Sequence, residues 1–180
     1  MKKSLIGAVV GMLILSACGS TENTAAEKPA AEKSAADVTF AQDMVPHHEQ
    51  ALEMAKLVPS RSSNDQVRGL AQRIEKAQDP EITRMNGWLK EWGAEQKSHE
   101  GHDMAGMMND EDMAKLEKAT GADFDKQWLD LMIKHHEGAV EMAKTELADG
   151  KDAEAKKLAQ AIIDGQQQEI TEMKDLLKTL

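Results

Sequence analysis

Two copies of one thirteen-residue phrase constrain this chain more than any other feature of its sequence. Residues 44–56 read MVPHHEQALEMAK, and residues 132–144 read MIKHHEGAVEMAK. Each copy holds a pair of adjacent histidines, namely His47 and His48 in the first and His135 and His136 in the second. Further identities continue downstream at the same offset of 88 residues, without an insertion. This pattern indicates two structurally equivalent units related by duplication.

The spacing of apolar residues predicts helices and gives no convincing strand. Apolar positions recur every three or four residues, as they do on one face of an α-helix. We predict helices over about residues 40–57, 65–92, 111–119, 123–148 and 152–180. Two helical hairpins, each with one apolar face, can bury those faces only against each other. The predicted fold is therefore all-α, an antiparallel four-helix bundle, in which the join between hairpins is either a short turn or a crossover.

The first 18 residues predict an exported lipoprotein. Lys2 and Lys3 precede an apolar run, LIGAVVGMLIL, that is too short to span a bilayer comfortably. The run ends in LSAC, which matches a bacterial lipobox and contains Cys18, the only cysteine. We predict that residues 1–17 are removed and that lipid on Cys18 anchors the protein to the extracytoplasmic face of a cell membrane. The alternative is an ordinary signal peptide or membrane anchor with an incidental cysteine.

Composition divides the rest of the chain into a tether and a folded domain. Residues 19–37 lack bulky apolar side chains, so we expect residues 18–37 to form a flexible tether. The bundle is predicted to occupy residues 38–180. Within it, the first repeat covers about residues 38–93, a Met/His-rich linker residues 94–121, and the second repeat about residues 122–180.

Charge and motif spacing argue against several functions. The net charge of −10 and the 3% aromatic content disfavour nucleic-acid binding. A di-iron carboxylate bundle needs ExxH on two helices, but Glu81 is followed by Arg84 and Glu169 by Glu172. HExxH and CxxCH are also absent from the sequence. We therefore expect a binding protein rather than an enzyme.

The histidine pairs lie in helical stripes with methionine, which suits a copper site. A methionine precedes the first histidine of each pair by three residues and another follows it by seven, so all three share a face. Imidazole binds several transition metals, whereas a thioether favours Cu(I). The candidate helical ligands are Met44, His47, His48, Met54, Met132, His135, His136 and Met142. The alternative is that the methionines fill core gaps and the histidines are hydrogen-bonded core groups.

Polar residues on or beside the same stripes offer support for the histidines. They are Gln78, Glu81, Gln166 and Glu169. Such side chains either hydrogen-bond the histidines as outer-sphere partners or line the edge of the helix seam.

A second candidate metal site lies in the linker, where residues 99–108 read HEGHDMAGMM. This stretch has no apolar periodicity, so core packing does not explain its methionines. Tracts of this kind bind Cu(I) or silver without a packed scaffold. The candidate ligands are His99, His102, Met104, Met107 and Met108. The alternative is a disordered linker that is merely rich in methionine.

The repeated M-x-x-HH-E-x-A-x-x-MA phrase, with Q-x-x-EI-x-x-M downstream, resembles the domain of unknown function 305 family over about residues 38–180. That family is described as helical, ferritin-like and often exported, and some members are linked to copper tolerance. The resemblance implies a fold and a copper role, but no reaction. The predicted function is therefore Cu(I) binding through His and Met for copper tolerance or handling. A non-covalent haem protein with His and Met axial ligands, and a helical interaction module without metal, remain alternatives.

Overall fold

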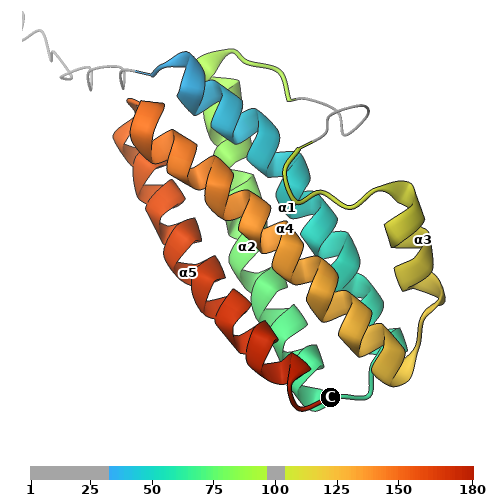
Figure 1. Ribbon diagram of the computed structural model, residues 1–180. Coiled ribbons are helices and arrows are strands. Elements are labelled where there is room, and N and C mark those ends of the chain that lie inside the picture. The colour runs from blue at the N-terminus through green and yellow to red at the C-terminus, as the bar shows by residue number, and fades with distance from the viewer. Residues whose placement is uncertain (1–32, 97–103) are drawn as a thin grey trace, which may run out of the picture. The chain divides into compact units, whose positions relative to one another are not determined.

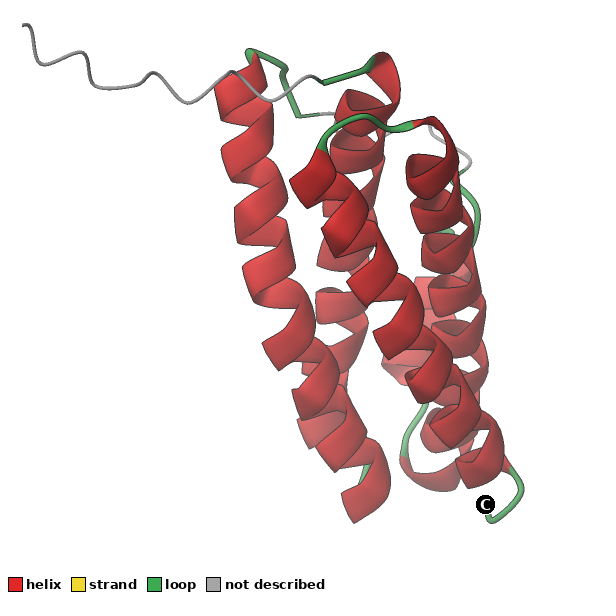
Figure 2. Ribbon diagram, turned by 90° about the vertical axis from the view of Figure 1, so that its left-hand side faces the viewer, coloured by secondary structure: helices red, strands yellow, loops and turns green. Residues whose placement is uncertain are grey.

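Five helices make up most of what the computed structural model describes, residues 33–96 and 104–180. They are α1 (Ala35–Arg61), α2 (Asp65–Trp92), α3 (Asp110–Lys118), α4 (Gly121–Asp149) and α5 (Ala153–Leu177). These two ranges contain no strand, so the all-helical prediction is confirmed (Figure 2). None of the helices described is long and apolar enough to cross a membrane. The predicted signal peptide, Cys18, His99 and His102 lie outside the described residues.

Helix α1 begins at Ala35, earlier than the predicted position near Phe40. The reason is a capping box, in which the Ser34 side chain accepts from the Asp37 N–H while the Asp37 carboxylate accepts from the Ser34 N–H. A capping box pairs N–H groups that a helix start otherwise leaves unpaired. The last residues assigned to the tether therefore belong to the first helix.

The bundle consists of two helical hairpins that meet along one side of each. Helix α1 packs along α2, α4 packs along α5, and the hairpins contact each other mainly through α1 and α4. The end of α2 lies beside the start of α1, where the Lys33 Nζ donates to the Trp92 carbonyl at 2.6 Å. The start of α4 lies at the opposite end of the bundle from the end of α2, and the described part of the linker carries α3 beside α4 (Figure 1). Of the two joins left open by the sequence, the structure has the crossover.

Two apolar clusters fill the bundle, and a polar layer separates them. The cluster at the end where α1 begins includes Phe40, Met44, Met85, Leu89, Ala139 and Ile162. The cluster at the other end includes Met54, Ile74, Trp128, Met132 and Met173. Between the two clusters, α1 and α4 carry the paired histidines, and α2 and α5 carry the glutamine and glutamate residues that were noted in the sequence. All four paired histidines lie in this layer and are fully buried.

Candidate metal centre

The inner histidines, His47 of α1 and His135 of α4, face each other at the middle of the polar layer. Their ring centroids lie 3.7 Å apart and their planes are tilted by 40°. The Nε2 of His47 lies 3.1 Å from the carbonyl oxygen of Ala105. The Nδ1 of His47 and both ring nitrogens of His135 have no hydrogen-bond partner among the described residues. Buried polar atoms are nearly always paired, so these nitrogens have the chemistry of groups that bind an ion or a water molecule.

The outer histidines, His48 and His136, point instead at carboxylates of the second helix in each hairpin. The Nε2 of His48 lies 2.8 Å from Glu81 Oε2, and the Nε2 of His136 lies 2.7 Å from Glu169 Oε2. Since an ionised carboxylate only accepts, Nε2–H is the donor in both pairs. Carboxylates orient metal-binding histidines in the same way. Of the two alternatives that the sequence left open for these glutamates, the hydrogen bonds to the histidines are present in both repeats.

Both inner histidines are neutral at pH 7. Burial lowers the pKa of His47 to about 3, with repulsion from His48 and His136 adding to it and the Ala105 carbonyl opposing it. Burial, followed by repulsion from the other three histidines, lowers the pKa of His135 well below its usual value. A neutral imidazole is the form that ligates a metal. The inner pair can therefore bind a cation without first losing protons.

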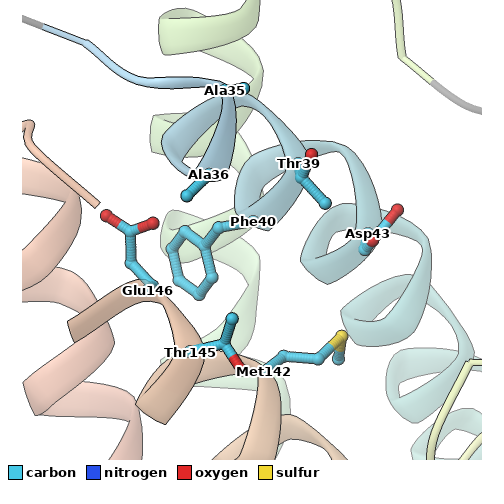
Figure 3. Close-up of a pocket in the computed structure, with 8 residues that line it drawn as sticks. All are labelled: Ala35, Ala36, Thr39, Phe40, Asp43, Met142, Thr145 and Glu146. Carbon is cyan, nitrogen blue, oxygen red and sulfur yellow. The ribbon is translucent and has the colours of Figure 1, made fainter. Parts of the chain in front are cut away.

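The four predicted helical methionines lie at two heights relative to the inner histidines. Met44 and Met132 precede them by one turn, about 4.5 Å along the axis, and both are fully buried. Met54 and Met142 follow by two turns, about 10 Å along the axis, beyond the one-turn spacing at which side chains of one helix meet. Met54 packs in an apolar cluster. Met142 is half-buried and lines a hollow of about 270 Å³ between α1 and α4 (Figure 3).

A short segment of the linker, residues 104–108, crosses α1 and α4 at the height of the histidines, and we call it the strap. The Gln50 side chain pairs with the Met108 backbone, accepting from its N–H and donating to its carbonyl at 2.8 Å each. At the equivalent position of the second repeat stands Gly138, where a Cβ would collide with the Ala105 carbonyl. Gln50 therefore binds the strap on α1, and Gly138 leaves room for it to approach α4.

The comparisons with known proteins agree with this architecture. The family model named Domain of unknown function (DUF305) matches residues 37–177. The chain belongs to the DUF305 family. The predicted family resemblance is therefore confirmed. None of the curated proteins is a significant match.

Solved structures of the DUF305 family are similar to this chain over most of their length. A protein from Streptomyces coelicolor, named as a candidate secreted DUF305 protein, is 37% identical with a TM-score of 0.75, covering 80% of this chain and 93% of that one. A DUF305 fragment from Deinococcus radiodurans is 32% identical with a TM-score of 0.77, covering 82% and 99%. CopM in its Cu(II)-bound form is 30% identical with a TM-score of 0.71, covering 79% and 96%. CopM structures with Cu(I) and with silver are also similar.

The strap of this DUF305 chain corrects one prediction about its methionines. Met108 is only 9% exposed and packs in the apolar cluster that contains Trp128 and Met132. Core packing therefore does explain Met108, because its pairing with Gln50 draws the linker down onto the bundle. Met104 and Met107 are half-buried.

The donor types of the histidine layer fit copper, but the ligands are not already arranged around an ion. In the part of the DUF305 chain that the structure describes, no three His, Cys, Asp or Glu side chains gather so that they could hold a metal. The rings of His47 and His135 are in contact, whereas an ion bound by both holds each nitrogen about 2 Å away. These rings must turn before they can share an ion. Neutral imidazole together with thioether is nevertheless a donor set that suits Cu(I).

Proposed function

We propose that this protein is lipid-anchored on the extracytoplasmic face of a membrane and binds copper, mainly as Cu(I), for copper tolerance or handling. The observation that carries the proposal is the layer of four buried histidines with unpaired ring nitrogens, two of them oriented by carboxylates. The copper-bound and silver-bound forms of CopM support the choice of metal. The candidate secreted relative supports an extracytoplasmic location. Binding rather than catalysis is the activity, within a bundle of ferritin-like type.

In this proposal the histidine layer supplies the buried copper ligands and the strap supplies ligands at the surface. His47 and His135 supply nitrogens at the centre, and Met44 and Met132 supply thioethers from neighbouring turns. At the surface, the strap and α4 line a shallow hollow of about 450 Å³ that includes Met107. Copper arriving there meets soft ligands first, and because the Ala105 carbonyl already pairs with Nε2 of His47, Nδ1 is the nitrogen of His47 left for the ion. His99, His102 and Met104 are proposed as further ligands in the linker.

We expect the inner histidines to provide the tightest Cu(I) binding. Replacing His47 and His135 together by Gln should raise the Kd of that class by tenfold or more, equivalent to at least about 1.4 kcal/mol. Replacing Glu81 and Glu169 by Gln should raise this Kd about 10-fold to 100-fold, because a neutral amide oxygen is a weaker acceptor than a carboxylate for the outer imidazoles. Titration of the mature protein with Cu(I) against a competing chelator measures both changes.

The exposed Glu172 on α5 supplies the matched control, since Glu172→Gln removes a carboxylate that pairs with Arg73 and contacts neither a histidine nor the hollow. Circular dichroism should show the same helix content in every variant. Equal Cu(I) affinity of the wild type and the double-histidine variant would show that the histidines are core groups. A Soret band after reconstitution with haem would favour the haem alternative instead.

The anchor has its own test. Cys18→Ser should leave the protein either unprocessed or released from membranes, because the lipidated residue of the LSAC sequence is lost. Membrane fractionation and the mass of the mature chain measure the outcome. The same mature mass and an unchanged membrane fraction would contradict the lipoprotein assignment.

A further inference from the structure

Two of the three tryptophans in the sequence lie half-buried at one end of the bundle. Trp88 and Trp92 are one turn apart on α2, and their rings stack with centroids 5.8 Å apart and planes 13° apart. Trp128, by contrast, is completely buried and donates its indole N–H to the Met54 carbonyl. The rings of Trp88 and Trp92 both pack against the apolar cluster that contains Phe40 and Leu89. Other half-buried apolar residues pack against that cluster too, namely Val38, Ala94, Met142 and Leu147. The copper proposal makes no use of this surface.

The chain enters the bundle at this same end. Lys33 donates to the Trp92 carbonyl at 2.6 Å, and its Nζ lies 6.0 Å from the centroid of the Trp92 ring. The proposed lipid anchor, Cys18, is only a short stretch of chain upstream of Lys33. Whatever its conformation, that stretch spans at most about 50 Å. The tether therefore joins the bundle at the end with the two tryptophans and keeps that end within about 50 Å of the anchor.

We propose that Trp88 and Trp92 form a contact surface for the membrane that holds the chain's own anchor, so that the bundle stands with this end on the lipid headgroups. The proposal rests on the lipid anchor of the proposed function. Tryptophan concentrates at membrane interfaces because its ring is largely apolar while its N–H needs a polar partner. A stacked, half-buried pair matches that environment better than it matches open water.

The charges around the pair identify the lipid. Among the described residues, Lys33 bonds to the Trp92 carbonyl, and Lys90, Glu91 and Glu95 are close to Trp92 in sequence, so the two positive charges are balanced by two negative ones. Attraction to anionic lipid needs clustered basic residues, which are lacking here. The partner that fits is a zwitterionic headgroup layer, with the indole rings at the level of the headgroups.

Fluorescence quenching in vesicles tests the proposal on the full lipidated protein. The protein is reconstituted into phosphatidylcholine vesicles, with or without lipid brominated near the headgroup end of the acyl chain. Wild-type emission should fall by roughly half in brominated vesicles, since two of its three tryptophans touch the lipid. The variant with Trp88→Phe and Trp92→Phe keeps only buried Trp128, and its emission should not change. Circular dichroism confirms that this variant is folded.

Each outcome separates the contact surface from the anchor. Flotation with the vesicles but no quenching of the wild type would overturn the contact surface and leave the anchor intact. Failure of the wild type to float would overturn the anchor and the contact surface together. Emission that shifts with protein concentration but not with lipid would identify a second copy of the chain as the occupant, and would overturn the proposal.

Discussion

Gly138→Ala should release the strap and destabilise the protein, although alanine is the better helix former. A Cβ at this position collides with the Ala105 carbonyl and lies 2.8 Å from the Gly106 Cα. Both neighbours are backbone, so no side-chain rotation relieves the contact. Either α4 shifts, at the cost of about 1–3 kcal/mol typical of overpacking, or the strap lifts and loses its bonds to Gln50 and His47. Urea unfolding and amide exchange at Met108, whose N–H donates to Gln50, measure the two routes.

Gly87→Ala is the matched control, because Gly87 lies within α2 on its exposed side, with nothing within 4 Å of an added Cβ. It should stabilise the protein by about 0.5–1 kcal/mol through helix propensity alone. If the two substitutions change the stability by the same amount and in the same direction, the strap does not depend on its close approach to α4.

Raising the pH from about 5 to 8 should destabilise the protein through a single buried acid, Glu146. This side chain is 1% exposed, lies under the turn after α4 and borders the hollow shown in Figure 3. Burial raises the pKa of Glu146 to about 8, with Asp37 and Asp152 adding to the rise and Lys156 opposing it. Burial alone would also raise the pKa of Asp37, but backbone N–H donors at Ser34 and Asp152, together with Glu146 and Ser34 side chains, lower it to about 2. The pair therefore keeps one proton, on Glu146, at neutral pH.

The sign of the pH effect follows from the pH at which the folded and the unfolded protein each lose that proton. Below pH 4.5, the ordinary pKa, Glu146 is protonated in both states and its contribution to stability is complete. Between that value and about 8 only the unfolded state releases the proton, so stability falls by up to about 1.4 kcal/mol per pH unit. Allowing for solvent screening at this helix end, we expect a total loss of about 2 kcal/mol. Asp37 loses its contribution only as the pH falls from 3.8 towards about 2, outside this window.

Glu146→Gln should remove most of this pH dependence, because the amide carries no titratable proton. Urea unfolding at pH 5 and pH 8 should then give similar free energies for the variant, and at pH 8 it should exceed the wild type. Glu141→Gln, an exposed acid on the same helix, should leave the wild-type slope unchanged. An equal slope in all three proteins would mean that Glu146 does not hold a proton in the folded state.

The helices could be predicted because each carries its own local signals, namely apolar residues at helical spacing and capping residues at the start. The doubled phrase indicated the histidine layer, but it did not indicate that all four histidines would be buried. Adjacent residues on a helix point about 100° apart, so the spacing alone directs only one histidine of each pair towards the bundle centre. Both are buried, because α1 and α4 each contact two neighbouring helices, one that faces His47 or His135 and one that faces His48 or His136.

The strap and the acid pair were missed because neither has a local pattern. The strap depends on Gln50 in one repeat and Gly138 in the other, and their difference is only one of four between the two copies of the phrase. Asp37 and Glu146 are far apart in sequence, and Asp37 looked like part of the tether. It is instead a buried acceptor for the N–H groups of Lys151 and Asp152, at 2.9 Å each.

The difference between Gln50 and Gly138 also bears on how such a protein can arise. Two separate copies of one hairpin could reproduce the layer itself, since its histidines and glutamates are the same in both repeats. Identical subunits, however, carry the same residue at every position, so both faces of such a dimer would offer glutamine or both would offer glycine. Binding the strap through a glutamine on one side and leaving room for it with a glycine on the other requires two halves with different sequences, which the two repeats of this chain provide.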